Sequence, residues 1–178
     1  MELSVKSMNQ ASKLLKDFED NYIKGISNSI KAATEGLYNK VLAYCYSNNI
    51  NNTDPIHWDY DENTNVGRVW TNDWTLIFNE MGTGVVGASS PHPSPADPFK
   101  NWVYDEGGHG ESGWWYPTTE SDANPHKWVD PDGQLRAWTK GLPSRHMFYS
   151  AFQDIKDELG DYVNVELQKT VGNMYSKE

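Results

Sequence analysis

The chain has 178 residues, and its 15 lysines and arginines against 25 aspartates and glutamates give a formal charge of −10 at pH 7. This balance argues against a nucleic-acid-binding surface, because that affinity needs clustered cations. No run approaches the roughly 18 apolar residues of a membrane span, so we expect no membrane partner. The single cysteine, Cys45, excludes an intramolecular disulfide. The length suits one domain over residues 1–178.

Residues 1–50 are predicted to be helical. Apolar residues recur at steps of three, four or seven along Val5–Tyr22, and a second such series covers Ile26–Tyr44. Because glycine inside a helix costs about 1 kcal/mol relative to alanine, we expect a break or kink at Gly25. Turn-forming residues at 48–55 then end the helical section.

Residues 56–143 are predicted to form a central antiparallel sheet with long loops rich in tryptophan and glycine. Val66–Trp70 and Trp74–Asn79 are short β-prone runs. The residues between them, Thr71-Asn72-Asp73, are typical of a turn, so the two runs predict a hairpin.

A second hairpin is predicted from His126–Asp130 and Gln134–Thr139. In its turn, Asp130-Pro131-Asp132-Gly133, the proline presets one backbone angle and Gly133 tolerates a positive φ. About forty residues rich in Gly, Pro, Ser and Trp separate the two hairpins. A stretch of that length without periodicity is usually functional, mobile or ordered by a partner.

Residues 144–172 are predicted to form a C-terminal helix. Apolar residues follow steps of four and three along Phe148–Leu167, Pro143-Ser144 is typical of a helix start, and Gly172-Asn173 of a helix end. Helices, then an antiparallel sheet, then a final helix packed on that sheet make the predicted fold class α+β.

The segment Gly82-Thr83-Gly84-Val85-Val86-Gly87 has the glycine spacing of a dinucleotide site. In such a site the last glycine opens a helix whose N-terminus faces the pyrophosphate. Here Pro91, Pro93 and Pro95 follow and cannot sustain that helix. We therefore expect Gly82 and Gly84 to shape a tight turn at the exit of a strand, and we expect no bound cofactor.

No metal site is predicted. No two histidines have the four-residue spacing of a helical pair, and there is no second cysteine to complete a common structural zinc set. The histidines are His57, His92, His109, His126 and His146.

Acidic residues near tryptophans are what a glycosidase or a carbohydrate-binding module would need. The acids concerned are Glu80, Asp105, Glu106 and Glu111. Acids and aromatic residues are abundant throughout this section, however, and no residue lies in a nucleophile elbow. We expect no catalytic residue, and carbohydrate binding or hydrolysis stays open as the alternative function.

Three tryptophans of the long middle segment, Trp102, Trp114 and Trp115, are candidate interface residues. Exposed Trp and Tyr rings are favoured anchors of protein interfaces. The other interpretation is that the rings fill the chain's own core, and the sequence leaves both open.

Several sequence segments from the middle and the end of the chain, termed here phrases, resemble those of one protein family. They are Asn79–Gly87 (NEMGTGVVG), Pro91-His92-Pro93, Tyr104-Asp105 with Gly108–Tyr116 (GHGESGWWY), and Thr139–Tyr149 (TKGLPSRHMFY). In this order and spacing they resemble the tail-completion, or head–tail joining (neck), proteins of long-tailed siphovirus bacteriophages. Together with the N-terminal helices, the resemblance covers most of the chain.

The resemblance implies a structural virion protein without catalysis. It would form a ring at the head-proximal end of the tail, with six subunits as in siphovirus tail rings or twelve as in a portal. DNA would pass through the lumen without sequence-specific binding. The neighbours would be head-side connector and tail-terminator or tail-tube proteins, and assembly would take place in the cytoplasm of the host bacterium.

Trp102, Trp114, Trp115 and Arg145 would lie at or near the subunit contacts of that ring. A planar guanidinium at Arg145, just before the last helix, suits pairing with a neighbour's carboxylate. His146 departs from the family pattern, because members commonly have proline there, and this puts the start of the last helix in doubt. The tryptophan-rich middle is also longer than in a minimal member.

The composition of the chain is compatible with a ring subunit of a phage neck. A negative chain suits a lumen through which DNA slides, and a single reduced cysteine suits a bacterial cytoplasm. A host-side regulatory or toxin-like domain is a third function class, for which the sequence supplies no motif.

Overall fold

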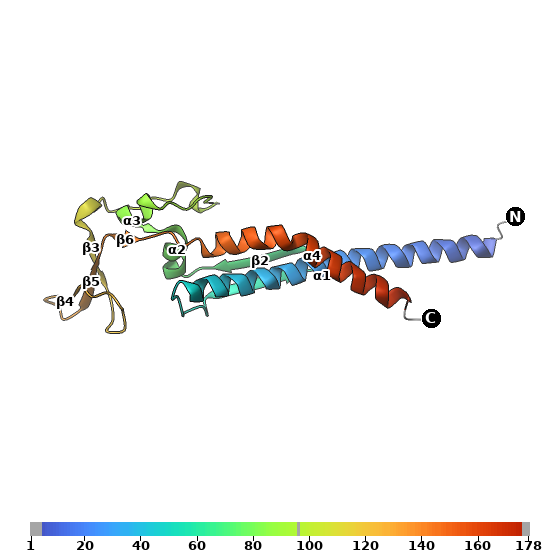
Figure 1. Ribbon diagram of the computed structural model, residues 1–178, viewed down its shortest axis with the longest axis horizontal. Coiled ribbons are helices and arrows are strands. Elements are labelled where there is room, and N and C mark those ends of the chain that lie inside the picture. The colour runs from blue at the N-terminus through green and yellow to red at the C-terminus, as the bar shows by residue number, and fades with distance from the viewer. Residues whose placement is uncertain (1–4, 96, 176–178) are drawn as a thin grey trace. The chain divides into compact units, whose positions relative to one another are not determined.

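The computed structural model describes residues 5–95 and 97–175, and its ribbon is drawn in Figure 1. Helices and small antiparallel sheets are both present, so the fold class is α+β, as the sequence predicted. Contacts divide the chain into two compact units. Unit 1 combines Met1–Trp70 with Ala151–Glu178, and unit 2 is Thr71–Ser150.

Unit 1 is built on α1, one uninterrupted helix over Val5–Ser47. The break expected at Gly25 does not occur. Gly25 is buried, and a Cβ atom there would lie 2.9 Å from Leu167 Cδ2 and 3.2 Å from Thr170 Oγ1, both on α4 (Met147–Tyr175). The missing side chain lets the two helices approach, so packing outweighs the low helix propensity of glycine.

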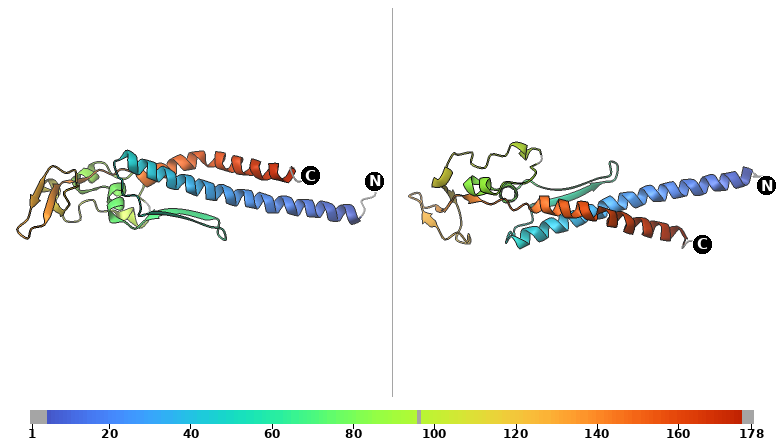
Figure 2. Two further views of the ribbon diagram at one scale, coloured as in Figure 1. Left: turned by 90° about the horizontal axis from the view of Figure 1, so that it is seen from below. Right: turned by 45° about the horizontal axis from the view of Figure 1, so that its top comes forward.

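Polar contacts join α4 to α1. Lys40 Nζ lies 3.0 Å from Glu158 Oε1, and the Tyr44 hydroxyl donates to Asp154 at 3.0 Å. We expected the C-terminal helix to pack on the sheet. The contacts described above instead join α4 to α1. The left view of Figure 2 shows the β-hairpin of this unit on the side of α1 away from α4. The buried apolar residues of the unit include Val41, Cys45, Ala151 and Ile155.

The β-hairpin consists of β1 (Ile56–Asp61) and β2 (Val66–Thr71). Its strand β1 packs on α1, where Ile56 is buried and the ring of Trp58 lies 6.4 Å from that of Tyr38. On β2, Gly67 lies so close to the buried Thr34 of α1 that any Cβ atom would overlap the threonine side chain. The hairpin therefore depends on a glycine at this position.

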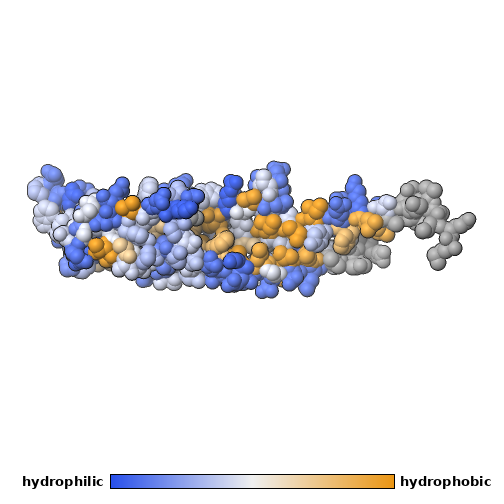
Figure 3. All heavy atoms as spheres, turned by 90° about the horizontal axis from the view of Figure 1, so that it is seen from above, coloured by the Kyte–Doolittle hydropathy of each residue, from blue (hydrophilic) through white to orange (hydrophobic). Residues whose placement is uncertain are grey.

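Among the α1 residues whose side chains the structure describes, five exposed apolar side chains lie within residues 14–23 and are termed here the α1 apolar row. Leu14 and Leu15 are 69% and 71% exposed, and Phe18, Tyr22 and Ile23 are 53%, 49% and 55% exposed. Leu14, Phe18 and Tyr22 are spaced by four residues and so share one face of the helix. Apolar residues at the surface of unit 1 are visible in Figure 3.

In unit 2, residues 74–79 form a helix and not the expected strand. The helix α2 (Trp74–Met81) begins at Asp73, whose Oδ1 accepts a hydrogen bond from the Leu76 N–H at 3.0 Å. This is an N-cap, so the residues that we assigned to a hairpin turn instead start a helix. The predicted first hairpin is therefore wrong, and β2 pairs with β1.

The second predicted hairpin is confirmed. β4 (Lys127–Val129) and β5 (Leu135–Thr139) pair antiparallel, and β3 (Trp114–Pro117) pairs with the other edge of β5. In the turn, Gly133 has a φ of +80°, and Asp130 accepts a hydrogen bond from Arg136 Nε at 2.6 Å. The Arg136 guanidinium is the main cause that holds the pKa of Asp130 below its usual value.

The remaining elements of unit 2 are short. They are α3 (Gly84–Ser89), β6 (Gly141–Leu142) and the single 3-10 turns η1 (Phe99–Asn101) and η2 (Gly110–Ser112). Within the two described ranges of the chain, the helices lack the long apolar stretch that crossing a membrane would require.

A substitution pair tests the packing of unit 1. Gly67→Ala should lower the free energy of unfolding by about 1–3 kcal/mol, because the new methyl group overlaps Thr34. Gly160→Ala, on α4 with open space around it, should raise it by about 0.5–1 kcal/mol through helix propensity. Urea unfolding monitored by circular dichroism gives both values. Equal effects of the two substitutions would contradict the close approach of β2 to α1.

Candidate functional site

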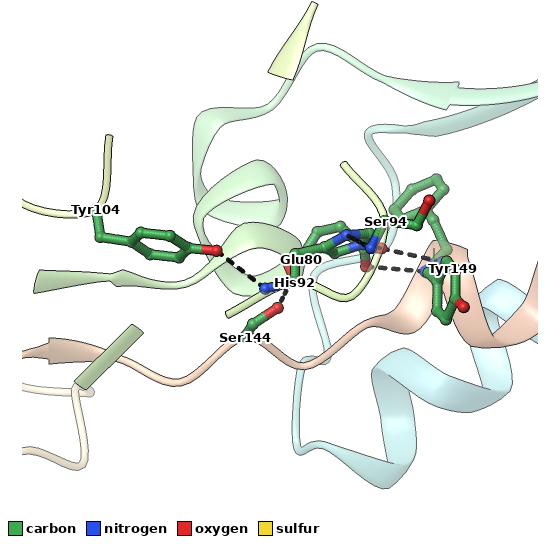
Figure 4. A network of polar contacts seen from close by, with 7 residues as sticks. Glu80, His92, Ser94, Tyr104, Ser144 and Tyr149 are labelled. Atoms are coloured by element: carbon green, nitrogen blue, oxygen red, sulfur yellow. Dashed lines mark hydrogen bonds and ion pairs between the residues drawn. The ribbon is translucent and has the colours of Figure 1, made fainter. Parts of the chain in front are cut away.

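A partly buried carboxylate in unit 2, that of Glu80, joins α2 to the start of α4. Glu80 Oε2 accepts the Phe148 N–H at 2.9 Å, and Oε1 accepts the Tyr149 N–H at 3.0 Å (Figure 4). These are the second and third residues of α4, whose N–H groups have no partner within the helix. A negative charge there also meets the positive end of the helix dipole. Glu80 therefore caps the last helix from a position far away in sequence.

His92 completes this arrangement, which we term the Glu80 junction. Its Nε2 lies 3.0 Å from Glu80 Oε1, and its side chain is only 5% exposed. The Ser94 N–H donates to His92 Nδ1 at 3.2 Å, so Nδ1 is an acceptor and Nε2 carries the proton that is donated to Glu80. The His92 N–H in turn donates to the Tyr104 hydroxyl at 2.9 Å.

The same junction joins phrases that are distant in the sequence. The Arg145 N–H donates to the Asn79 carbonyl at 2.8 Å, and Arg145 Nε donates to Asn79 Oδ1 at 3.0 Å. The Ser144 hydroxyl donates to the Glu80 carbonyl, and the Leu142 N–H donates to Thr83 Oγ1 at 3.1 Å. The segments around residues 79–84 and 141–149 thus form one structural unit.

His146 lies beside the junction in a conformation that proline is unable to adopt. Its φ is +53°, whereas the proline ring fixes φ near −65°. Its Nε2 is buried and, among the described residues, has no hydrogen-bond partner. Burial is the main cause that lowers the pKa of His146, and the neighbouring His92 lowers it further. The ring centroids of the two histidines are 5.4 Å apart.

The glycine-rich turn serves backbone packing against this junction. Gly82 has a φ of +80° and Gly84 a φ of +61°. A Cβ atom on Gly82 would lie 2.8 Å from the Ser144 nitrogen, and one on Gly84 would overlap the Lys140 carbonyl. The turn follows helix α2 and not the strand that we expected, and Gly82 forms its C-cap. The helix after it, α3, ends at Ser89, before the prolines.

A groove with a volume of about 540 Å³ lies next to this turn. Four of its aromatic rings form a row in which each ring contacts the next. The distances between ring centroids are 5.7 Å for Trp74 and Phe78, 6.0 Å for Phe78 and Trp102, and 5.8 Å for Trp102 and Phe99. Trp114 adds a fifth ring. Trp102 Nε1 donates to the Gly82 carbonyl at 2.9 Å, so the turn fixes the ring. These five residues define the aromatic groove.

Two of the four predicted interface residues line the aromatic groove, namely Trp102 and Trp114. Trp115 follows Trp114 on β3 and so points to the other face of the sheet, where its ring lies 5.8 Å from that of Trp128. Arg145 is bonded to Asn79 in the Glu80 junction. The structure therefore brings together one pair of the predicted residues and leaves the other two elsewhere.

Three of the four candidate acids, Glu80, Asp105 and Glu111, have structural partners. Glu80 caps α4, and Glu111 Oε2 lies 2.7 Å from Lys140 Nζ. Asp105, in the lining of the groove, accepts the N–H groups of Gly110 at 2.7 Å and His109 at 3.0 Å, and the His109 ring at 3.0 Å. The Gly110 hydrogen bond is the main cause that holds the pKa of Asp105 below its usual value. A general acid needs the opposite shift.

The histidines do not form a metal site within the described part of the chain, where no group of three or more His, Cys, Asp or Glu side chains has a metal-binding arrangement. His57 and His126 lie against the rings of Trp70 and Trp138. Sequence reasoning missed the clustering of Glu80, His92 and His146. These three residues are far apart in the chain, so the only sequence signal for their clustering was the order of the segments that resemble the neck family.

The chain matches no protein-family model, no curated protein and no solved structure.

The Glu80 junction makes a first prediction about stability. Glu80→Ala should lower the free energy of unfolding by about 1–3 kcal/mol, because partly buried N–H groups of α4 lose their acceptor. Glu80→Gln keeps one acceptor oxygen and should cost less. Glu111→Ala removes an exposed ion pair and should cost at most about 1 kcal/mol. Urea unfolding measures all three, and equal losses for Glu80→Ala and Glu111→Ala would refute the role of Glu80 as a cap.

A second prediction concerns pH. The folded state favours neutral His146, whereas the unfolded chain takes up a proton below about pH 6.5. The contribution of His146 to stability is therefore complete above about pH 6.5 and declines as the pH falls below it. His146→Asn tolerates a positive φ and does not titrate. It should flatten the decline in unfolding free energy between pH 7.5 and pH 5, and unchanged slopes would disprove the assignment.

Proposed function

We propose that this chain is a structural protein of a bacteriophage neck, a ring subunit that completes the head-proximal end of the tail and helps to join tail to head around the DNA path. The observation that carries the proposal is the Glu80 junction. It makes one connected structure out of the phrases Asn79–Gly87, Pro91-His92-Pro93 and Thr139–Tyr149, which resemble the neck family. Segments that a protein family keeps in the same order for structural reasons should lie together in the fold.

Two exposed surfaces support assembly with other protein chains. The aromatic groove presents Trp74 at 60% exposure, and the α1 apolar row presents Leu14 and Leu15 at 69% and 71%. Large exposed apolar patches mark interaction sites, and aromatic rings are favoured there. A ring requires that one surface of each subunit contacts a different surface of the next. Two unlike apolar surfaces on one chain suit such a contact.

The remaining parts of the proposal follow the family resemblance. The ring would have six subunits, or twelve where it matches the portal. Its neighbours would be the head-side connector and the tail-terminator or tail-tube proteins, within a virion assembled in the bacterial cytoplasm. The charge of −10 suits a lumen that lets DNA pass without binding it.

Carbohydrate binding is the second candidate function. The aromatic groove favours it, since sugars stack on exposed tryptophan rings and Asp105 and Glu106 lie in the lining. The hydrogen bonds that Asp105 accepts from its own loop favour binding over hydrolysis. Quenching of tryptophan fluorescence by soluble oligosaccharides would support this function against the neck proposal.

The neck proposal predicts that Trp114→Ala blocks assembly and leaves the helices intact. An interface anchor of this kind typically contributes at least about 2 kcal/mol to association. Native mass spectrometry should show rings for the wild type and monomers for the variant, and circular dichroism should show equal helix content. In a phage lysate, full heads and tails should fail to join.

Trp115→Ala tests the other face of the sheet separately.

If Trp114 is only a core residue, the Trp114→Ala variant should aggregate and melt at a lower temperature than the wild type. Joined, infectious particles that carry alanine at positions 102, 114 and 115 together would show that these rings are not the assembly surface.

A further inference from the structure

The aromatic groove combines open ring faces with negative charge. Trp74 is 60% exposed and Phe78 is 38% exposed. Asp105 and Glu106 belong to the lining, and none of the described lining residues is a lysine or an arginine. A cation that enters this groove therefore meets aromatic rings and carboxylates together.

Glu106 is the carboxylate that is open to a ligand. Asp105 is already engaged by the backbone N–H groups of His109 and Gly110 and by the His109 ring. Glu106 is exposed, and no partner for its side chain occurs among the described residues. An incoming cation would supply that partner without breaking an existing contact.

We propose that the aromatic groove binds an arginine- or lysine-bearing segment of a partner protein, with the cation against the indole rings and paired with Glu106. Cations are attracted to the faces of aromatic rings, most strongly to tryptophan, and a guanidinium also stacks on them. This inference deepens the proposed neck function, and it rests on that function in taking the groove as an assembly surface.

Charge and size both favour a protein segment. Nucleic acid phosphates are repelled by the two carboxylates and by a chain of charge −10. An open groove of about 540 Å³ has room for a few side chains of an extended segment. The rings next to the carboxylates take up apolar side chains that flank the cation, so a basic and apolar segment uses the whole surface.

The test uses the whole chain and two blocked peptides, Gly-Leu-Arg-Leu-Gly and Gly-Leu-Gln-Leu-Gly. Binding is followed through the NMR shifts of the tryptophan indole N–H groups. The arginine peptide should bind about five to ten times more tightly than the glutamine peptide, and added salt should narrow this preference. Glu106→Gln should reduce the preference to less than about twofold. The matched control Glu62→Gln, which removes an exposed carboxylate between β1 and β2, should preserve it.

Equal affinities for the two peptides, no measurable binding of either, or an unchanged preference in Glu106→Gln would each overturn the inference. Tighter binding of a soluble oligosaccharide such as cellohexaose would overturn it in favour of a glycan site. Rings of the wild-type chain without any preference for the arginine peptide would leave the neck proposal standing. Absence of rings under all conditions would instead count against the neck proposal itself.

Discussion

The organisation of unit 2 depends on one partly buried carboxylate. Glu80 supplies the acceptors for the first N–H groups of α4 and for the His92 ring, so three chain segments meet at a single side chain. Such an acceptor is effective because the helix end and the hydrogen bonds both favour a negative charge there. The groove is linked to the same segments, because the Tyr104 hydroxyl accepts the His92 N–H, the Tyr104 carbonyl accepts the Gly84 N–H, and Trp102 Nε1 donates to the Gly82 carbonyl.

Local signals predicted those elements that local interactions stabilise. The Asp130–Gly133 turn and the apolar spacing of the last helix each carry their own cause, so β4, β5 and α4 were found. At Asp73 the composition fitted both a turn and a helix cap, and the cap prevailed. Gly25 was misread because its partner, Leu167, lies on a helix that no local pattern connects to it.

The candidate site was only partly accessible to sequence reasoning. Trp102 and Trp114 stood out by residue type, and they do share a groove. The alternation of a β-strand separates Trp115 from Trp114, but this separation requires a strand assignment that the loop-rich sequence did not give. Arg145, which we predicted at a subunit contact, binds Asn79 across a long sequence separation, and no local pattern indicated this bond. Contacts of that kind become visible only in the folded chain.

The division of the chain has a consequence for its synthesis. Unit 2 is an insertion between the two halves of unit 1, since Thr71–Ser150 separates α1 from the part of α4 that packs on it. At about 5–20 residues per second, a ribosome takes roughly 4–16 s to make that insertion. At the end of this interval unit 2 has all of its own residues, whereas Lys40 and Tyr44 of α1 still lack their partners Glu158 and Asp154 on α4. In a nascent chain unit 2 should thus be complete before α1 meets α4, and premature release would leave the side of α1 that α4 covers open to chaperones.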